Sequence, residues 1–235
     1  MSSTAFSRTF VSALLLALAG CAAQPRTLQV LFQDDFISGL ANWQIEAEQP
    51  GRITAANGVL DIDVPAGVTL WFKPRLDGPV VIEFEATAVA AGGPNDQISD
   101  LNMFWMAHDR DGTEPVYAVA RGGKFSEYNN LLTYYVGVGG NRNHTTRFRR
   151  YIGDLFLRPL LPEHDLTTAS TLLVANRAQK ITLVADQGRI ECSRDGEVLF
   201  RFQDLAPYVS GWFALRTTYS HLQIRQLRIY RLPNN

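Results

Sequence analysis

The sequence lacks the patterns that define several common protein classes. Only two of its 235 residues are cysteine, so a framework of several disulfides is excluded. Lysine and arginine form no runs and the formal net charge is −1, which excludes the basic stripe of a nucleic-acid-binding protein. No segment sustains the 3.6-residue spacing of an amphipathic helix. No His/Cys spacing indicates zinc, so we expect neither a metal nor a cofactor.

The N-terminal residues indicate a targeting segment. Arg8 supplies positive charge, and an apolar run from Phe10 to Ala19 follows it. That run is too short for a membrane-spanning helix, which takes about 20 residues. Leu18-Ala19-Gly20-Cys21 then resembles a bacterial lipobox.

The lipobox resemblance implies a location. It gives a lipoprotein signal peptide over residues 1–20, acylation of Cys21 and a lipidated tether over 21–27, with lipid as the sole membrane attachment. By the same resemblance, Ala22 favours the outer membrane. We therefore expect a cell-envelope lipoprotein that faces the periplasm or the cell surface. An ordinary signal peptide with a chance cysteine is the alternative.

From residue 28 onward the chain consists of short strands joined by turns. Val59–Val64 alternates with period two, and Asp195-Gly196 is a hairpin signal because glycine accepts positive φ without cost. β-branched and aromatic runs recur at intervals of roughly 8–12 residues. The expected strands include 28–32, 59–64, 69–72, 80–86, 180–185, 189–194, 198–202, 211–216 and 221–230. These indicate one all-β domain over 28–235, in which Cys192 is a small core residue.

Two flanking regions carry a resemblance that specifies the fold. They are Phe32-Gln33-Asp34-Asp35-Phe36 with Leu40 and Trp43 at the start, and 194–200, 211–216 and 224–230 at the end. They resemble the opening and closing strands of the concanavalin A-like superfamily. The resemblance implies an all-β, concanavalin A-like two-sheet jelly-roll sandwich, and it specifies fold more than function.

The middle of the chain carries a narrower resemblance. It rests on residues 100–107 (DLNMFWMA), 125–135 (FSEYNNLLTYY), 145–151 (TTRFRRY) and 158–161 (RPLL). These resemble an uncharacterised bacterial family of galectin-like proteins, similar to the YesU proteins encoded among rhamnogalacturonan-utilisation genes. The resemblance implies a role in polysaccharide utilisation and a polysaccharide or oligosaccharide partner, but it assigns no catalytic residue.

Period-two alternation sorts the polar residues of this middle region onto strand faces. Three sets result, each on one face of its strand: Arg147, Arg149 and Tyr151; Thr133 and Tyr135; Asp100 and Asn102. A jelly roll has a concave side that can hold a chain of sugars. If every polar set lies on that side, one groove is surrounded by Asn102, Tyr135, Arg147 and Arg149, with His144 at its rim.

Such a groove suits β-elimination on an acidic sugar. Removal of the C5 proton of a uronic acid builds charge on its carboxylate, which an arginine fork can neutralise. We expect Arg147 or Arg149 as neutraliser, Tyr135 or His144 as base, and Tyr134 or Tyr151 as acid. The side chains expected to contact substrate are Asn102, Asp100, Trp105, Glu127, Asn129 and Arg150.

Three alternatives stay open at this point. Glycoside hydrolysis needs two carboxylates on one site, for which Glu127 and Asp100 are available. A non-catalytic glycan-binding lipoprotein uses the same residue types as an enzyme does. A purely structural envelope lipoprotein would leave the arginines on a solvated strand face.

Overall fold

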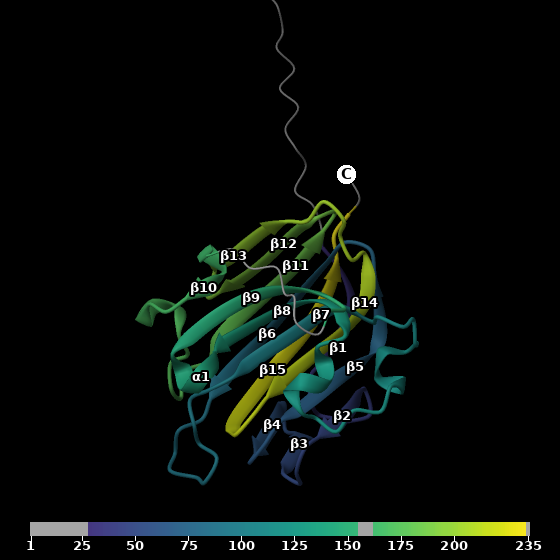
Figure 1. The fold of residues 1–235 in the computed structure, drawn as a ribbon. Coiled ribbons are helices and arrows are strands. Elements are labelled where there is room, and N and C mark those ends of the chain that lie inside the picture. Colours follow the sequence, from purple (N-terminus) through teal and green to yellow (C-terminus); the bar gives the residue numbers. More distant parts are fainter. Residues whose placement is uncertain (1–27, 155–161, 234–235) are drawn as a thin grey trace, which may run out of the picture.

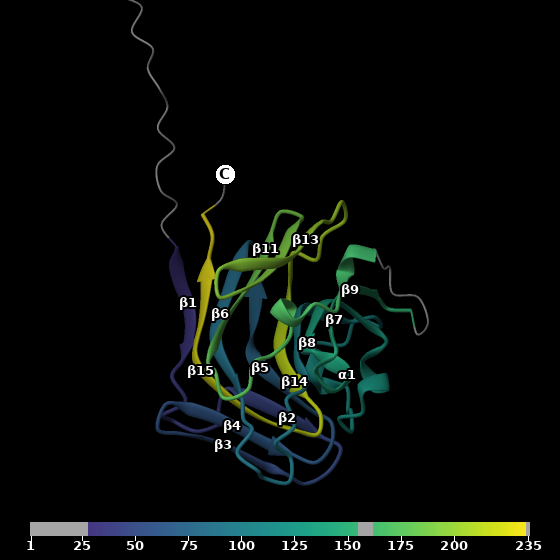
Figure 2. The ribbon, with the colours of Figure 1, turned by 90° about the vertical axis from the view of Figure 1, so that its left-hand side faces the viewer.

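The arrangement of the strands confirms the expected all-β sandwich. The computed structural model describes residues 28–154 and 162–233, so Cys21, the expected signal peptide and Arg158 lie outside the described residues. Two antiparallel sheets, sheet A and sheet B, pack against each other, and Figure 2 shows the two layers side by side. In sheet A the order is β13 (Glu197–Gln203), β12 (Arg189–Arg194), β11 (Gln179–Asp186), β6 (Val80–Ala88), β15 (Ser220–Arg231), β4 (Val59–Val64) and β3 (Arg52–Ala56), and β1 (Gln29–Asp34) also pairs with β15.

Sheet B carries the middle of the sequence. Its order is β10 (Asp165–Leu166), β9 (Thr145–Ile152), β8 (Leu131–Gly139), β7 (Leu101–Asp109), β14 (Ser210–Thr217), β5 (Val68–Asp77) and β2 (Trp43–Ala47) (Figure 1). The three strands expected to hold the polar sets are therefore direct neighbours. The sequence order β7, β8, β9 is kept because each strand pairs antiparallel with the next, β7 with β8 across the long segment 110–130 and β8 with β9 across the short segment 140–144.

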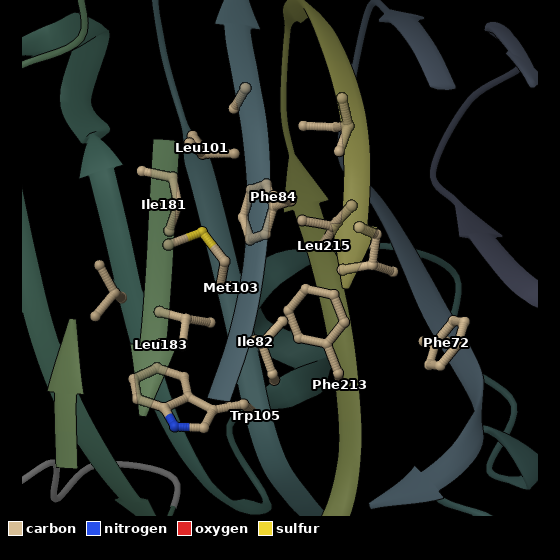
Figure 3. Packing of buried hydrophobic residues seen from close by; sticks show 14 of the residues in the cluster. Phe72, Ile82, Phe84, Leu101, Met103, Trp105, Ile181, Leu183, Phe213 and Leu215 are labelled. Carbon is tan, nitrogen blue, oxygen red and sulfur yellow. The ribbon is translucent and has the colours of Figure 1, made fainter. Parts of the chain in front are cut away.

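The main core fills the space between the sheets. Ile82 and Leu183 of sheet A meet Met103, Trp105 and Phe213 of sheet B (Figure 3). All five are fully buried, and burial of one such side chain contributes about 1.5–3 kcal/mol. Cys192 lies in the same core as expected, where burial raises the pKa of its thiol to about 12.

Most expected strands are confirmed, with bounds that shift by a few residues. The Asp195-Gly196 turn is also confirmed, since both residues have positive φ, 53° and 85°, as a type I′ hairpin turn requires. β5 is longer than expected and extends to Asp77, and the short strand β10 was not expected at all.

A long connection covers part of the outer face of sheet B. We call residues 110–130 the cap; they include the short 3₁₀ helices η1 (Val116–Ala118) and η2 (Phe125–Tyr128). Tyr128 of the cap is fully buried in a second apolar cluster with Trp71, Phe104 and Trp212 of sheet B. Within residues 28–154 and 162–233, no helix is long and apolar enough to cross a membrane.

Candidate functional site

A polar pocket of about 250 Å³ lies on the outer face of sheet B, next to the cap. It is lined by Glu48, Asp100, Asn102, Phe125, Tyr135, Gly137, Gly140, Asn141, Thr145, Arg147, Arg216 and Thr218. Four residues expected at the site therefore line one pocket: Asp100, Asn102, Tyr135 and Arg147. They come from β8, β9, β7 and the residue directly before β7.

The face assignment from period-two alternation is confirmed on all three strands. Asn102 of β7 and Tyr135 of β8 line the pocket, whereas their neighbours Met103 and Tyr134 point into the core between the sheets. A bulge does interrupt β7, at Met106, which has a φ of 52°. The bulge lies beyond Asn102 along the strand, so it leaves the faces at the pocket unchanged.

Tyr135 and Asn102 form the floor of the pocket. The Tyr135 hydroxyl donates a hydrogen bond of 2.8 Å to Asn102 Oδ1. A side chain at Gly137 would collide with both groups, so glycine keeps this floor open. Burial, with the nearby Tyr151 and Asp100, raises the pKa of Tyr135 well above 10. Tyr135 is therefore a neutral phenol that can donate a proton or hydrogen bond.

Asp100 supplies a carboxylate of unusual basicity. Burial raises its pKa to about 6, although the charge of Arg216 opposes that shift. Its backbone adopts φ 52°, a left-handed conformation that aspartate tolerates better than most residues and that recurs at functional sites. At neutral pH this carboxylate is ionised and is matched to accept a proton.

Arg216 of β14 is the main residue that the sequence analysis missed. Its side chain is 3% exposed, and its Nη1 donates to Thr69 Oγ1 at 2.9 Å and to Gly123 O at 2.7 Å. No carboxylate of the described residues forms an ion pair with it. A buried guanidinium without a carboxylate is costly, so Arg216 is suited to receive an anionic group. The sequence does indicate a special role for Arg216. It alternates with Trp212 and Ala214 and is the one charged residue of β14.

Arg147 and Arg149 share one carboxylate at the edge of sheet B. Arg147 Nε lies 3.2 Å from Asp165 Oδ1, and Arg149 Nη2 donates to the two Asp165 oxygens at 2.8 and 3.1 Å. Arg147 is half-exposed and lines the pocket, whereas Arg149 is buried beside it and does not. The structure therefore places Arg147 at the pocket and Arg149 behind it, holding Asp165.

Three expected site residues point to the inner face of sheet B and do not reach the pocket. Tyr134 donates a hydrogen bond of 2.7 Å to Asp204, which Arg150 also binds at 2.7 Å. Trp105 lies fully buried between the sheets. Each has the opposite parity to the pocket residue of its own strand, Tyr135, Arg147 or Asn102, which explains the difference.

The other expected residues do not line the pocket. His144 is exposed and its Nδ1 contacts Asn141 O at 2.8 Å. Tyr151 is buried in the second cluster, with its ring 5.7 Å from that of Tyr135. Glu127 accepts a hydrogen bond from the Gly122 N–H, and Asn129 ends η2. Among the described residues, no group of three His, Cys, Asp or Glu is arranged to hold a metal ion.

Comparison with known proteins places the chain in a family. The model of a family described as a domain of unknown function, DUF6250, matches residues 62–227. The chain belongs to the DUF6250 family. The match spans the strands that build the pocket, from β5 to β14. None of the curated proteins matches this DUF6250 chain in sequence.

Solved structures similar to the DUF6250 chain share its fold. A Bacillus subtilis protein of unknown function with a galectin-like fold has a TM-score of 0.69 at 14% identity, covering 90% of this chain and 99% of its own. An endo-β-1,3-glucanase from Pyrococcus furiosus has 0.60 at 10%, covering 89% and 97%. The carbohydrate-binding module CBM66 from Bacillus subtilis has 0.50 at 9%, covering 88% and 99%. These likenesses show the concanavalin A-like jelly-roll fold; the expected link to YesU proteins stays a prediction.

Proposed function

We propose that the pocket binds an acidic glycan and cleaves it by β-elimination, on a uronic-acid-containing polysaccharide of the pectin or rhamnogalacturonan type. The observation that carries the proposal is the buried Arg216 guanidinium, which forms no ion pair with a carboxylate of the described residues and lines the same pocket as Asp100 and Tyr135. The names of two proteins of similar fold, a carbohydrate-binding module and a glucanase, support a carbohydrate ligand.

The pocket residues supply the three roles that elimination needs. Arg216 binds the uronate carboxylate and stabilises the charge that develops on it, with Arg147 at the pocket edge as a second cation. Asp100 takes the C5 proton, because its pKa of about 6 leaves it ionised at neutral pH. Tyr135 gives its proton to the leaving O4 oxygen, because its high pKa keeps it protonated.

The atoms balance without a cofactor. The C5–H bond breaks and its proton goes to Asp100; the electron pair forms the C4=C5 double bond; and the C4–O4 bond breaks as O4 receives the Tyr135 proton. The proton on Asp100 restores Tyr135 through solvent. These assignments differ from the sequence-based expectation, in which Tyr135 or His144 was the base.

The test is an assay of cleavage on a panel of acidic polysaccharides. The ultraviolet absorbance of the unsaturated uronide product measures the rate. We expect Asp100→Asn and Tyr135→Phe to lower kcat by about 10²–10⁴, the usual contribution of a general acid or base, with binding retained. Arg216→Gln should weaken binding by a factor of at least about 30, because it removes a charged partner. His144→Gln is the matched control and should retain full activity.

Other outcomes identify the rival functions. New reducing ends without ultraviolet absorbance would show hydrolysis, with Glu48 and Asp100 as the carboxylates that line the pocket. Binding without turnover on any substrate would show a glycan-binding protein. Absence of both binding and turnover would overturn the proposal.

We also propose that the chain is exported and anchored through acylated Cys21. The lipobox-like sequence Leu18-Ala19-Gly20-Cys21 supports this, and two or more acyl chains give stable attachment. A Cys21→Ser chain expressed in a bacterial host should leave the membrane fraction for the soluble one. If it stays with the membrane as the parent chain does, the anchor is elsewhere.

A further inference from the structure

We infer that the pocket accepts the terminal sugar of a chain, so that the glycan is shortened from one end and not cut internally. The inference rests on the proposed function and names the form of substrate that the same site takes. It follows from what surrounds the pocket: the cap closes one side of it, and the opposite side is open to solvent.

The closed side is formed by direct contact between two backbones. Gly123 of the cap lies against Gly67 and Glu48 of the segments that flank β2 and β5. A Cβ at Gly123 would lie 2.6 Å from Glu48 N and 2.9 Å from Gly67 O, so there is no space between the two segments for even a methyl group. A sugar chain cannot pass between the cap and sheet B at this point.

Aromatic rings complete the closed side around Arg216. Its guanidinium carbon lies 5.1 Å from the ring centre of Phe125 and 5.0 Å from that of Tyr128, both in the cap. The Phe125 ring also packs on Tyr135, at 5.7 Å. Arg216 therefore stands at the inner end of the pocket, and an anionic sugar bound to it has cap atoms directly behind it.

The cap is held firmly, so the closure is permanent and not a moving lid. Tyr128 donates a hydrogen bond of 2.6 Å to Glu46 of β2. Arg121 forms a 3.0 Å ion pair with Asp109 of β7, and both side chains are 2% exposed. Figure 1 shows the cap lying across the front of β14 and β5. Opening it would break these buried polar contacts, which are costly to leave unpaired.

The open side lies toward β9. Arg147 has a side chain that is 43% exposed, and Asn141 beside it is exposed. Both line the pocket, so a glycan whose last sugar lies on Arg216 can leave across this edge into solvent. A volume of about 250 Å³ suits one sugar ring and not a long bound segment.

The experiment measures two quantities with oligogalacturonides and rhamnogalacturonan oligosaccharides: the size of the cleavage products, and the affinity of binding when a chain end is blocked. With the parent chain, the unsaturated product should have one size from the earliest time point. With Tyr135→Phe, which holds intact ligand, affinity should stay constant within about threefold from trimer to hexamer. The sugar on Arg216 is the one whose C4–O4 bond breaks, so it is the reducing-end sugar. Reduction of that end should weaken binding at least about tenfold through lost hydrogen bonds in the pocket, whereas a 4-O-methyl group at the other end should change affinity less than about threefold.

Cap variants test the closed side itself. Phe125→Ala removes an exposed ring from the wall and should convert the single product into a mixture of sizes. Lys124→Ala, the adjacent exposed cap residue that does not line the pocket, should leave the product pattern unchanged.

Each outcome separates this inference from the proposed function. An early ladder of unsaturated products would overturn the end-recognition inference and leave β-elimination standing. Binding that depends on a free end, without any cleavage, would support the inference and overturn the elimination. Affinity that rises steadily with length and ignores reduction of the reducing end would overturn the inference, and loss of all binding would overturn both.

Discussion

The Tyr128 hydroxyl in the cap donates a hydrogen bond of 2.6 Å to Oε2 of Glu46 in β2. Trp71 Nε1 donates to the same oxygen at 3.0 Å. Burial raises the pKa of Glu46, although these two hydrogen bonds oppose the rise. One carboxylate that is 6% exposed thus joins the cap to the sheet beneath it.

Removing the Tyr128 hydroxyl should therefore loosen the whole cap. We expect Tyr128→Phe to lower the free energy of unfolding by about 1.5–3 kcal/mol, the range for a hydrogen bond to a charged group. Urea denaturation measures this. Tyr117→Phe is the control, because its hydroxyl makes an exposed 3.3 Å contact to Lys73 O and should cost less than about 0.5 kcal/mol. Equal losses in the two variants would contradict the role of Glu46.

Two adjacent tyrosines should respond in opposite ways to the same substitution. Tyr134 binds Asp204 between the sheets, whereas Tyr135 binds Asn102 in the pocket. Tyr134→Phe should lower the melting temperature and leave the kcat of correctly folded protein unchanged. Tyr135→Phe should lower kcat and leave the melting temperature within a few degrees of the parent. The reverse pattern would place the site on the wrong face of β8.

Activity should fall on the acidic side with the ionisation of Asp100. A base must be deprotonated, and burial raises the pKa of Asp100 to about 6. The logarithm of kcat/KM should therefore be flat near pH 7 and decrease by about one unit per pH unit below pH 6. Initial rates between pH 4.5 and 8 measure this. An acidic limb centred near pH 4 would indicate a base other than Asp100.

His221, on the outer face of sheet A, should make stability depend on pH. It lies between Asp61 and Asp96, at 2.9 Å from each. Burial alone would lower its pKa, but these hydrogen bonds and the charge of Asp63 raise it above 6.5. The protonated form therefore stabilises the fold fully below pH 6.5, and this contribution is lost as pH rises through the raised pKa.

Denaturant unfolding between pH 6 and 9 tests the contribution of His221. The free energy of unfolding should decrease over this range in the parent chain and should change less in His221→Gln. His164→Gln is the contrasting variant, because burial lowers the pKa of His164 and its effect appears as pH falls below 6.5. A slope that survives in His221→Gln would assign it to other groups.

The strands and their faces could be predicted because periodicity is local. Asn102, Tyr135 and Arg147 were placed on one face from alternation, and neighbouring strands in the chain pair with each other in sheet B. The cap could not be predicted, since residues 110–130 are polar and glycine-containing without a period. Its position depends on tertiary contacts such as that between Tyr128 and Glu46.

The candidate site was predictable only in the part that comes from consecutive strands. Arg216 and Glu48 are distant in sequence from Tyr135, and they reach the pocket because β14 lies between β7 and β5. That strand order is a property of the completed sandwich. Tyr134 and Arg150 were expected at the site by residue type, although parity places them on the inner face.

The inert core thiol makes the folded domain convenient for single-site labelling. Cys192 is the free cysteine of the described residues, and it is fully buried with a pKa of about 12. Alkylating reagents attack the thiolate, so they should leave the native domain unmodified. A cysteine introduced at exposed Asn141 would then be the one reactive thiol of residues 28–154 and 162–233, and a fluorophore attached there would report directly on ligands that enter across the β9 edge.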